Sequence, residues 1–328
     1  MPAHLSILDL ALIPAGGAAS EAYAGSVALA QKAEDLGYLR VWYAEHHNIP
    51  SIASSATSVL IAHVAAHTKR IRLGAGGIML PNHAPLVIAE QFGMLATLHP
   101  GRIDLGLGRA PGTDQITLRA LRISPGEADN FPSDVLELQG YLGDETRIAG
   151  VDATPGKGTH VPLYILGSSL FGAQLAARLG LPYGFASHFA PDALEEAVHV
   201  YRRDFRPSAQ LDAPYVIAGL NVLAADTGGE AGAQLVSVQR ARVRAVLGRG
   251  HSWTDQEADA VLESRAGLAV KNMTRYAAVG VASEVRAYVE HFVQIARADE
   301  VMTVHVAPTV QARLRSIELL ASVIAPVP

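Results

Sequence analysis

The sequence of 328 residues contains no cysteine, and this absence excludes several kinds of chemistry at once. Without cysteine there is no disulfide bond, no thiolate ligand for a metal ion and no cysteine nucleophile. A small secreted domain held together by disulfides is therefore excluded, and the composition suits an intracellular protein, so we expect a cytoplasmic location.

Long apolar runs and blocks of basic residues are missing as well. No stretch reaches the roughly 18 to 20 consecutive apolar residues that a membrane-spanning helix needs. Residues 1–4 do not begin the pattern of a secretory signal. Lysine and arginine number 26 against 31 acidic residues, which gives a formal net charge of −5. These features argue against a membrane or a nucleic acid as the partner.

Short β-type runs alternate with longer amphipathic stretches along a chain that is 49% apolar. Strands are predicted over residues 3–10, 39–43, 70–75, 102–107, 162–166, 182–186, 214–224 and 300–305. Helices are predicted over residues 20–36, 55–66, 85–98, 126–142, 169–180, 191–205, 283–297 and 308–324. Eight strands that each lead to a helix predict an α/β fold, a (β/α)8 TIM barrel. No linker rich in proline, glycine or serine divides the chain, so residues 1–328 are predicted to form one domain.

Residues 226–282 interrupt this alternation, because they are longer than one connection between a strand and a helix. They include two helical stretches, 230–247 and 256–268. Long excursions of this kind commonly cover a functional site, so we predict a lid or insertion before the last strand. Two shorter segments, 109–125 and 143–161, are predicted to be loops over the end of the barrel.

An acid and two imidazoles, Glu45, His46 and His47, follow directly where the apolar strand 39–43 ends. In parallel α/β folds, ligands and chemistry collect at the carboxyl ends of strands. Because adjacent side chains project in different directions, at most one histidine is expected to point into the barrel mouth. A pair of surface histidines beside an acid is the alternative interpretation. No zinc-ligand spacing such as His-Glu-x-x-His is present, so no metal site is predicted.

Glycines gather where the third and fourth strands end. Three of the residues 74–77 are glycine, which indicates either a close approach of the backbone to a ligand or a bulge that lets the barrel turn. Gly106 and Gly108 form a Gly-x-Gly pair, but the third glycine of a dinucleotide-binding fingerprint is out of phase. Without that fingerprint, the segment is interpreted as a glycine-rich strand end followed by Arg109. This arginine can pair with a phosphate in a bidentate manner.

The fifth and sixth strands also end in polar residues. Gly167, Ser168 and Ser169 directly precede a helix, and backbone N–H groups with serine hydroxyls at a helix N-terminus can bind an anion. Plain N-capping by one serine is the alternative. Ser187, His188 and Phe189 follow the sixth strand and can form another wall of the ligand site. Together these strand ends predict a phosphorylated, flat, aromatic ligand.

Several of these segments, taken in order, resemble the bacterial luciferase-like flavin-dependent monooxygenases. The resemblance covers essentially the full length and is nearest to the single-chain oxidoreductases of that family. It is carried by Trp-Tyr-Ala-Glu-His-His at 42–47, Gly-Gly-Ile-Met-Leu-Pro at 76–81, Pro-Gly-Arg-Ile-Asp-Leu-Gly-Leu-Gly-Arg-Ala at 100–110, Leu-Tyr-Ile-Leu-Gly-Ser-Ser at 163–169 and Ala-Arg-Leu-Arg-Ser-Ile-Glu-Leu-Leu-Ala at 312–321. Any one segment alone is weak, whereas the ordered set is specific.

The resemblance implies a barrel that binds flavin mononucleotide (FMN) at the carboxyl ends of its strands. His46 matches the catalytic histidine of luciferase, with Glu45 as a supporting residue. Gly108 stands where luciferase has a reactive cysteine, which implies free space beside the flavin and argues against light emission. The other implied cofactor contacts are a cis peptide beneath the ring at Gly76 and Gly77, the phosphate site at Arg109, Gly167, Ser168 and Ser169, and the flavin edge at Leu166 and Ser187.

The resemblance further implies a two-component monooxygenase. Reduced FMN would arrive as a co-substrate from a separate flavin reductase, and O2 would then be used to oxidise a small organic substrate such as an aldehyde. An F420-dependent dehydrogenase or reductase of the same superfamily and a non-catalytic flavin-binding protein are the alternatives. A homodimer is implied as well, with the helices at 55–66 and 85–98 as its candidate interface.

Overall fold

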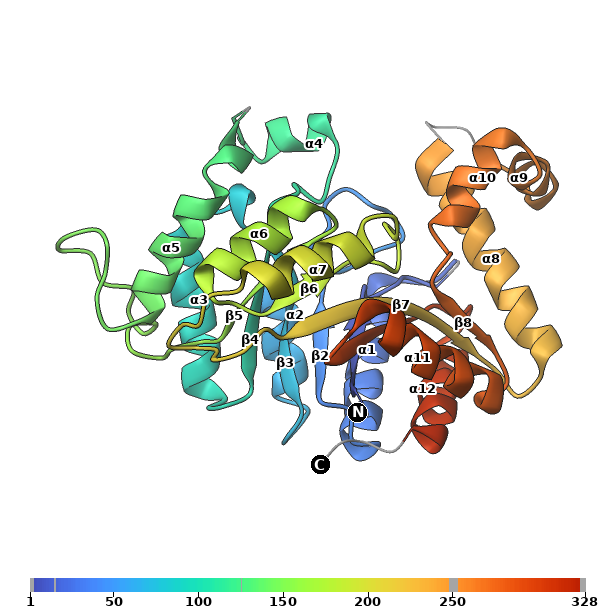
Figure 1. Ribbon diagram of the computed structural model, residues 1–328. Coiled ribbons are helices and arrows are strands. Elements are labelled where there is room, and N and C mark those ends of the chain that lie inside the picture. The colour runs from blue at the N-terminus through green and yellow to red at the C-terminus, as the bar shows by residue number, and fades with distance from the viewer. Residues whose placement is uncertain (1–2, 15, 125, 248–252, 325–328) are drawn as a thin grey trace.

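Eight parallel strands close into a barrel in the computed structural model, which describes residues 3–14, 16–124, 126–247 and 253–324. The ring is completed where residues 4–7 of the first strand pair with residues 300–303 of the last. The barrel strands are β1 (His4–Asp9), β2 (Arg40–Tyr43), β3 (Arg72–Met79), β4 (Ile103–Gly108), β5 (Leu163–Gly167), β6 (Tyr183–Phe185), β7 (Val216–Ala224) and β9 (Glu300–His305) (Figure 1). All eight predicted strands are present, and the predicted TIM barrel is confirmed.

One more strand in the described residues, β8 (Ala277–Gly280), lies outside this ring and was not predicted. Its partner β7 is long enough to have two neighbours on one edge: residues 216–218 pair with β6, and residues 221–224 pair with β8. The other edge of β7 pairs with β9 over residues 217–222. β8 lies within the insertion, outside the alternation of strands and helices from which the barrel strands were predicted.

Helices surround the barrel close to their predicted positions (Figure 1). They are α1 (Ala19–Asp35), α2 (Thr57–Ala65), α3 (Pro85–Leu98), α5 (Phe131–Leu142), α6 (Leu170–Leu179), α7 (Leu194–Asp204), α11 (Ala282–Ala296) and α12 (Val310–Val323). α5 begins later than the predicted residue 126, after the short 3-10 turn η2 (Glu127–Asp129). Pro132 lies in its first turn, where a missing N–H breaks no helical hydrogen bond. None of the described helices is long and apolar enough to cross a membrane.

The two segments predicted to be loops differ from one another. Residues 143–161 contain neither helix nor strand, as predicted. The segment 109–125 contains one short helix, α4 (Gln115–Ala120), and is therefore not entirely a loop. The Asp114 side chain starts this helix by accepting the N–H groups of Ile116 and Thr117. A further 3-10 turn, η1 (Leu80–Asn82), follows β3.

The described residues of the insertion at 226–282 are largely helical, as predicted, and stand beside the open end of the barrel (Figure 1). Its helices are α8 (Gly228–Leu247), α9 (Asp255–Leu262) and α10 (Arg265–Asn272). Residues 248–252 lie outside the described part. The stretch 256–268, predicted to be helical, is divided between α9 and α10, because the Ser264 hydroxyl accepts the Gly267 N–H and begins a new helix. A small apolar core of its own holds the insertion together, formed by Val243, Ala258, Leu262 and Val270.

Charged side chains fill the amino-terminal end of the barrel interior. The buried Asp104 accepts hydrogen bonds from Arg40 Nη1 at 2.8 Å and from Trp42 Nε1 at 3.2 Å, and it also pairs with Arg72. Arg40 Nε lies 3.0 Å from Glu300 Oε1, so this arginine is held between two buried carboxylates. Burial lowers the pKa of Arg40, but the two carboxylates raise it by more, and it stays charged. This network closes one end of the barrel.

Candidate functional site

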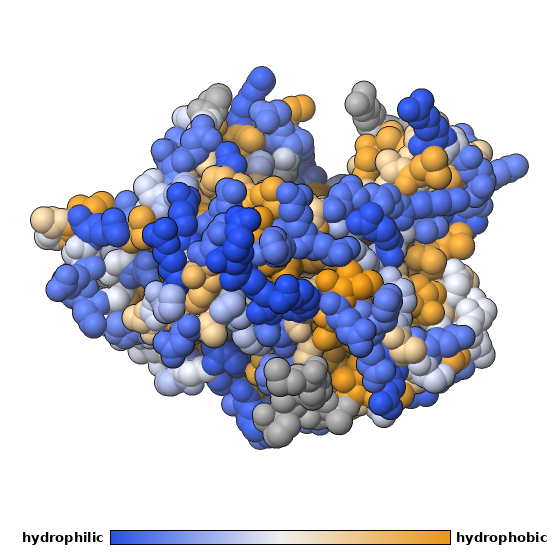
Figure 2. All heavy atoms as spheres, in the orientation of Figure 1, coloured by the Kyte–Doolittle hydropathy of each residue, from blue (hydrophilic) through white to orange (hydrophobic). Residues whose placement is uncertain are grey.

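A cavity of about 760 Å³ opens at the carboxyl ends of the barrel strands, opposite the buried charges. In the space-filling view the upper edge of the molecule is hollowed between the side that carries α4 and the insertion (Figure 2). Helices α5, α6 and α8 supply parts of the wall. The apolar floor consists of Leu8, Trp42, Ala44, Ile217, Met302 and Val304. This is the face at which TIM-barrel enzymes hold their active sites.

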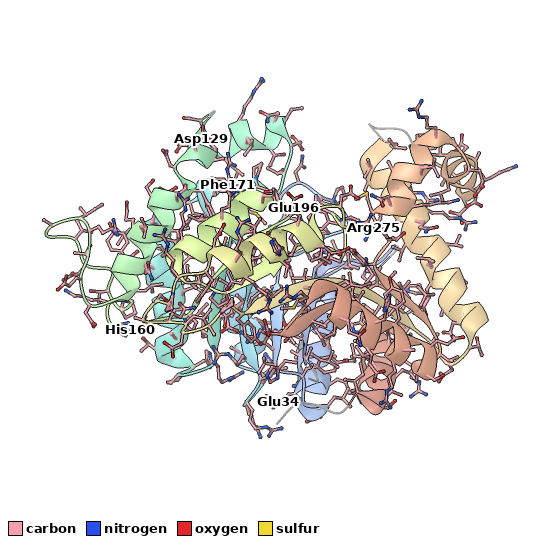
Figure 3. All side chains as sticks on the ribbon, viewed as in Figure 1. Glu34, Asp129, His160, Phe171, Glu196 and Arg275 are labelled. Carbon is pink, nitrogen blue, oxygen red and sulfur yellow. The ribbon has the colours of Figure 1, made fainter. Side chains whose placement is uncertain are left out.

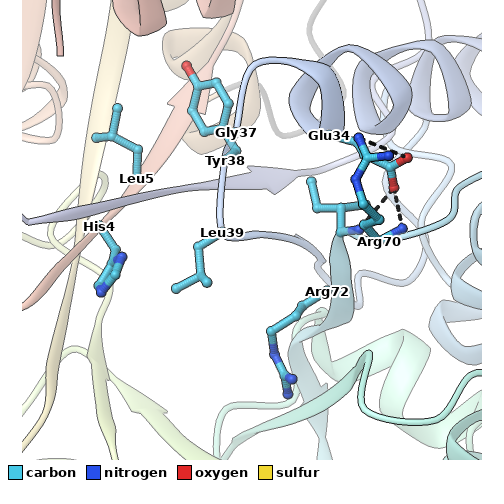
Figure 4. A pocket seen from close by; sticks show the side chains of 9 residues that line it. His4, Leu5, Glu34, Gly37, Tyr38, Leu39, Arg70 and Arg72 are labelled. Atoms are coloured by element: carbon cyan, nitrogen blue, oxygen red, sulfur yellow. Dashed lines mark hydrogen bonds and ion pairs between the residues drawn. The ribbon is translucent and has the colours of Figure 1, made fainter. Parts of the chain in front are cut away.

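A smaller cavity of about 310 Å³ lies at the other end of the barrel, near the amino ends of β1, β2 and β3 (Figure 4). Its Glu34 carboxylate accepts the backbone N–H groups of Lys69, Arg70 and Ile71, with 2.6 Å to the Arg70 nitrogen. Burial raises the pKa of Glu34, but these hydrogen bonds lower it by more. Because the backbone already occupies this carboxylate, the smaller cavity is structural.

β3 contributes Gly76 and Gly77 to the wall of the large cavity, and the peptide bond between them is cis, as the resemblance implies. The pairing of β3 with β4 shifts register between Gly76 and Ile78, so the predicted bulge is present too. No side chain fits here, since a Cβ on Gly77 would lie 2.7 Å from both the Gly106 oxygen and Leu166 Cδ1. The backbone itself therefore faces the cavity, and a flat ring can lie against it.

Arg109, Ser168 and Ser169 line one side of the cavity, at the end of β4 and the start of α6. The Arg109 guanidinium carbon lies 4.4 Å from the ring centroid of Phe171, and Nη2 donates to the exposed Asp129 at 3.1 Å. Figure 3 shows Asp129 and Phe171 close together on the upper side of the molecule. The Ser169 hydroxyl makes no capping hydrogen bond, so plain N-capping is not its role. Guanidinium, hydroxyls and helix N–H groups together can bind an anion.

Gly108, Leu166 and Gly167 line the cavity beside these residues. The space expected next to Gly108 is not free, because a Cβ there would lie 2.9 Å from Met79 Sδ. Met79 is the register partner of Gly108 across β3 and β4, and its thioether fills the direction in which a side chain would project. The expectation of an open gap at this position is therefore wrong.

Two imidazoles, His46 after β2 and His188 after β6, line the cavity. The Nδ1 atoms of both are buried, with no hydrogen-bond partner in the described residues. Burial lowers the pKa of His46; Glu45 raises it by less, and His47 lowers it again. Burial, with Arg242 and His46 adding to it, lowers the pKa of His188 to about 3. Both rings are therefore neutral at neutral pH.

Two residues predicted to belong to the site, Glu45 and Ser187, do not line the cavity. The buried Ser187 hydroxyl donates to the Gly219 oxygen at 2.6 Å, and it is the next residue, His188, that lies in the cavity wall. The sequence places the whole tripeptide that begins at Ser187 at a strand end. It does not say which side chain turns inward, because that depends on the neighbouring strand β7.

Glu45 is 1% exposed and joins three segments behind the cavity wall. Its Oε1 accepts from His47 Nε2 at 2.8 Å and from His83 Nε2 at 2.9 Å, and its Oε2 accepts the Met79 N–H at 2.9 Å. Burial raises the pKa of this carboxyl, but the hydrogen bonds, that from His83 first, lower it by more. Glu45 thus acts on the site indirectly, by fixing the turn that carries His46.

Replacing Glu45 with glutamine is expected to lower the free energy of unfolding at pH 7 by about 1 to 3 kcal/mol, because one buried donor loses its acceptor. The folded-state pKa of Glu45 lies below its ordinary value of 4.5. Its stabilising effect is therefore present above that value and is lost as the pH falls through the lowered pKa. In urea denaturation the difference between wild type and Glu45→Gln should shrink from neutral towards acid pH; a constant difference would contradict this account.

The insertion supplies residues to the cavity that sequence reasoning did not assign. Val238, Ala241, Arg242 and Ala245 of α8 line it. Arg242 Nη2 donates to the His188 oxygen at 3.0 Å, which ties α8 to the loop after β6. No local pattern in α8 indicates that its arginine reaches this loop, because the contact joins segments far apart in the sequence.

A TIM barrel with a glycine wall, a group of donors that can bind an anion and neutral imidazoles at its carboxyl face is typical of enzymes that hold a ligand over the strand ends. The chain belongs to the luciferase-like monooxygenase family, whose model matches residues 4–302. The luciferase-like monooxygenase of Escherichia coli (strain K12) is 48% identical over 97% of this chain and 96% of the relative. The N-acetyl-S-alkylcysteine monooxygenase of Bacillus subtilis (strain 168) is 36% identical over 80% of each chain.

Solved structures share the fold across nearly the whole chain. Apo-MsnO8 has a TM-score of 0.89 and 32% identity, and 99% of each chain is covered. The oxygenating constituent of 3,6-diketocamphane monooxygenase from Pseudomonas putida, in complex with FMN, has a TM-score of 0.73, with 16% identity over 99% of this chain and 98% of the other. An F420-dependent secondary alcohol dehydrogenase has a TM-score of 0.71, with 14% identity over 98% and 99%. The predicted family is confirmed, and it supports monooxygenase or related oxidoreductase activity.

Proposed function

We propose that this protein is the oxygenase of a two-component monooxygenase, which receives reduced FMN from a separate flavin reductase and uses O2 to oxidise a small organic substrate. One observation carries the proposal: a single cavity combines an anion site beside Arg109, a wall without side chains at Gly77 and a neutral imidazole, His46. FMN consists of a flat ring system and a side chain that ends in a phosphate. The phosphate corresponds to the anion site, and the ring corresponds to the wall without side chains.

The donor set fits FMN by its chemistry. Arg109, Ser168, Ser169 and the first N–H groups of α6 would hold the phosphate, since charged and bidentate donors suit phosphate oxygens. The residues that would face the ring are Gly76, Gly77, Gly108, Leu166 and Gly167. When bound, reduced FMN supplies the electrons with which one atom of O2 enters the substrate and the other leaves as water.

His46 would move a proton in this reaction. Its Nδ1 is buried and unpartnered among the described residues, and the ring lines the cavity, so we assign the contact with a ligand to Nε2. Because burial lowers its pKa, the ring is unprotonated at neutral pH and can take up and return a proton at Nε2. The apolar floor would keep water from the reacting atoms. The insertion at 226–282 would act as the lid of this single-domain chain.

The cofactor assignment is tested by replacing Arg109 with alanine. Wild-type protein should bind FMN more tightly than riboflavin, which lacks the phosphate. Arg109→Ala should weaken FMN binding about tenfold to a hundredfold and leave riboflavin binding unchanged, because only the charge-assisted contact is lost. Fluorescence titration measures both.

Arg178→Ala, at the far end of α6, is the matched control and should change neither affinity. Equal binding of FMN and riboflavin by the wild type would contradict the phosphate site. Tighter binding of F420 than of FMN would favour the F420-dependent dehydrogenase instead, whose relative shares this fold.

We also propose that the protein forms a homodimer through α2 and α3. Val87, Met94 and Leu98 are exposed apolar residues spaced along one side of α3, and Val59 on the neighbouring α2 is 67% exposed. Covering them with a second copy of the chain would remove this apolar area from water. Light scattering of the purified protein should give twice the chain mass of 34.5 kDa, and a monomer would contradict the proposal.

A further inference from the structure

Arg242 is a cation in the cavity wall whose protein partners are all uncharged. Its Nη2 donates to the His188 oxygen at 3.0 Å and to Asn221 Oδ1 at 3.3 Å, and its Nη1 donates to the Met273 oxygen. No carboxylate among the described residues forms an ion pair with it. Burial lowers its pKa to about 10, with no acidic group acting against that shift. Arg242 therefore stays charged at neutral pH.

The neighbouring arginines on α8 differ from Arg242 because they form ion pairs with carboxylates. Arg240 pairs with Asp255 and Asp259, and Arg244 pairs with Asp255. Neither Arg240 nor Arg244 lines the cavity, whereas Arg242 does. Within one helix, the arginines outside the cavity have carboxylate partners and the one in the cavity wall has none in the described chain.

The cavity thus has cations on two sides. Arg109 contacts α6 through Phe171, while Arg242 belongs to α8 and contacts the loops after β6 and α10. In Figure 1, α8 and α10 stand across the open end of the barrel from α4 and α5. If the phosphate of FMN occupies the side of Arg109, the positive charge of Arg242 remains available for a second anion.

We propose that Arg242 binds the carboxylate of the substrate, and that the substrates are small organic acids with an apolar body. This inference rests on the proposed function, which assigns the side of Arg109 to FMN. A carboxylate matches the guanidinium in charge. Nη2 uses both of its N–H groups within the described chain, so the carboxylate would accept charge-assisted hydrogen bonds from Nε and from the second N–H of Nη1. The apolar body would extend over the floor, at Ile217 and Met302, towards His46, which lines the same cavity.

The experiment compares octanoate with 1-octanol, which has the same chain length but no charge, by isothermal titration calorimetry of the flavin-free protein. Wild type should bind octanoate about tenfold more tightly than octanol. Arg242→Gln should remove this preference, and Arg242→Lys should keep part of it, because the charge is retained. Arg244→Gln is the matched control, since it removes a charge from the same helix outside the cavity, and it should leave the preference unchanged.

A second variant keeps Arg242 and its three hydrogen bonds. Ala245 lies three residues along α8 from Arg242 and also lines the cavity, so Ala245→Glu supplies the missing carboxylate within the wall. It should abolish the preference for octanoate as well. If the preference is absent in the wild type, or survives in both Arg242→Gln and Ala245→Glu, the proposal is overturned.

Titration of the same variants with FMN separates this inference from the proposed function. FMN affinity should be unchanged in Arg242→Gln, and the octanoate preference should persist in Arg109→Ala. If the wild type does not bind FMN, the flavin assignment is wrong. An octanoate preference that depends on Arg242 would still support the anion site in that case. Normal FMN binding without any octanoate preference would overturn the anion site alone.

Discussion

Replacing His46 with alanine is expected to lower the rate of substrate oxidation by about two to four orders of magnitude and to leave FMN binding nearly unchanged. His46 has an unpartnered, buried Nδ1 and lies in the cavity wall, so its loss would remove the proposed proton-transfer group and leave the proposed phosphate site in place. The rate is measured with reduced FMN, O2 and a substrate that the wild type oxidises. Turnover equal to that of the wild type would rule out the assignment.

The pH profile gives an independent test of His46. Because burial lowers its pKa below the ordinary 6.5, the neutral ring predominates at pH 7 and is lost only as the pH falls through the lowered value. The acid limb of the profile should therefore lie below pH 6.5 and be absent in His46→Ala. His47→Ala serves as the control, because His47 bonds to Glu45 and does not line the cavity. It should retain the limb.

Replacing the buried Asp104 with asparagine is expected to lower the free energy of unfolding by about 3 to 5 kcal/mol. The change leaves Arg40 with one carboxylate, Glu300, and removes the carboxylate that pairs with Arg72. It also turns an amide N–H2 group towards donors that need an acceptor. Urea denaturation measures the loss. The milder change Arg72→Met, at the partly exposed rim of the same network, should cost less and provides a measurement if Asp104→Asn does not fold.

The control is Asp226→Asn, which removes an acid that pairs with Arg315 on the surface. It should leave the stability nearly unchanged, because water screens exposed ion pairs. Similar small effects from Asp104→Asn and Asp226→Asn would mean that the charges inside the barrel do not govern its stability.

The fold was predictable because it depends on local patterns. Apolar runs and helical spacing identified every barrel strand and its helix, and the count of eight led to the closed ring. β8 was missed because it lies within the insertion, where the alternation of strands and helices that identified the barrel strands is interrupted. α4 was missed because its capping residue, Asp114, lies among loop-forming residues. Both are elements whose formation depends on a few residues and their neighbours in space.

The cavity was predictable only in part. Residues at the carboxyl ends of strands, such as Gly77, Arg109 and Ser169, were found because a parallel barrel brings all such ends together. The direction in which a particular side chain points could not be predicted. Glu45, for example, turns away from the cavity to bind His83 and the Met79 N–H, which belong to another segment.

Arg242 shows that contacts between segments distant in the chain could not be predicted from the sequence. Its place in the cavity depends on how the insertion folds back onto the loop that carries His188. Arg242 Nη2 donates to this loop, while α8 packs against α9 and α10 through their shared apolar core. A sequence pattern shows that α8 is a helix, but the wall it completes is formed by segments distant in the chain.

Rapid mixing of O2 with protein that has been saturated anaerobically with reduced FMN tests most directly whether this cavity holds the reduced flavin and governs its reaction. The absorbance of oxidised FMN follows the reaction. We predict that reoxidation of the bound flavin is slower than that of free reduced FMN, and that Arg109→Ala restores the rate of the free flavin. Reoxidation by the wild type that is indistinguishable from that of free reduced FMN at saturating protein would contradict the account.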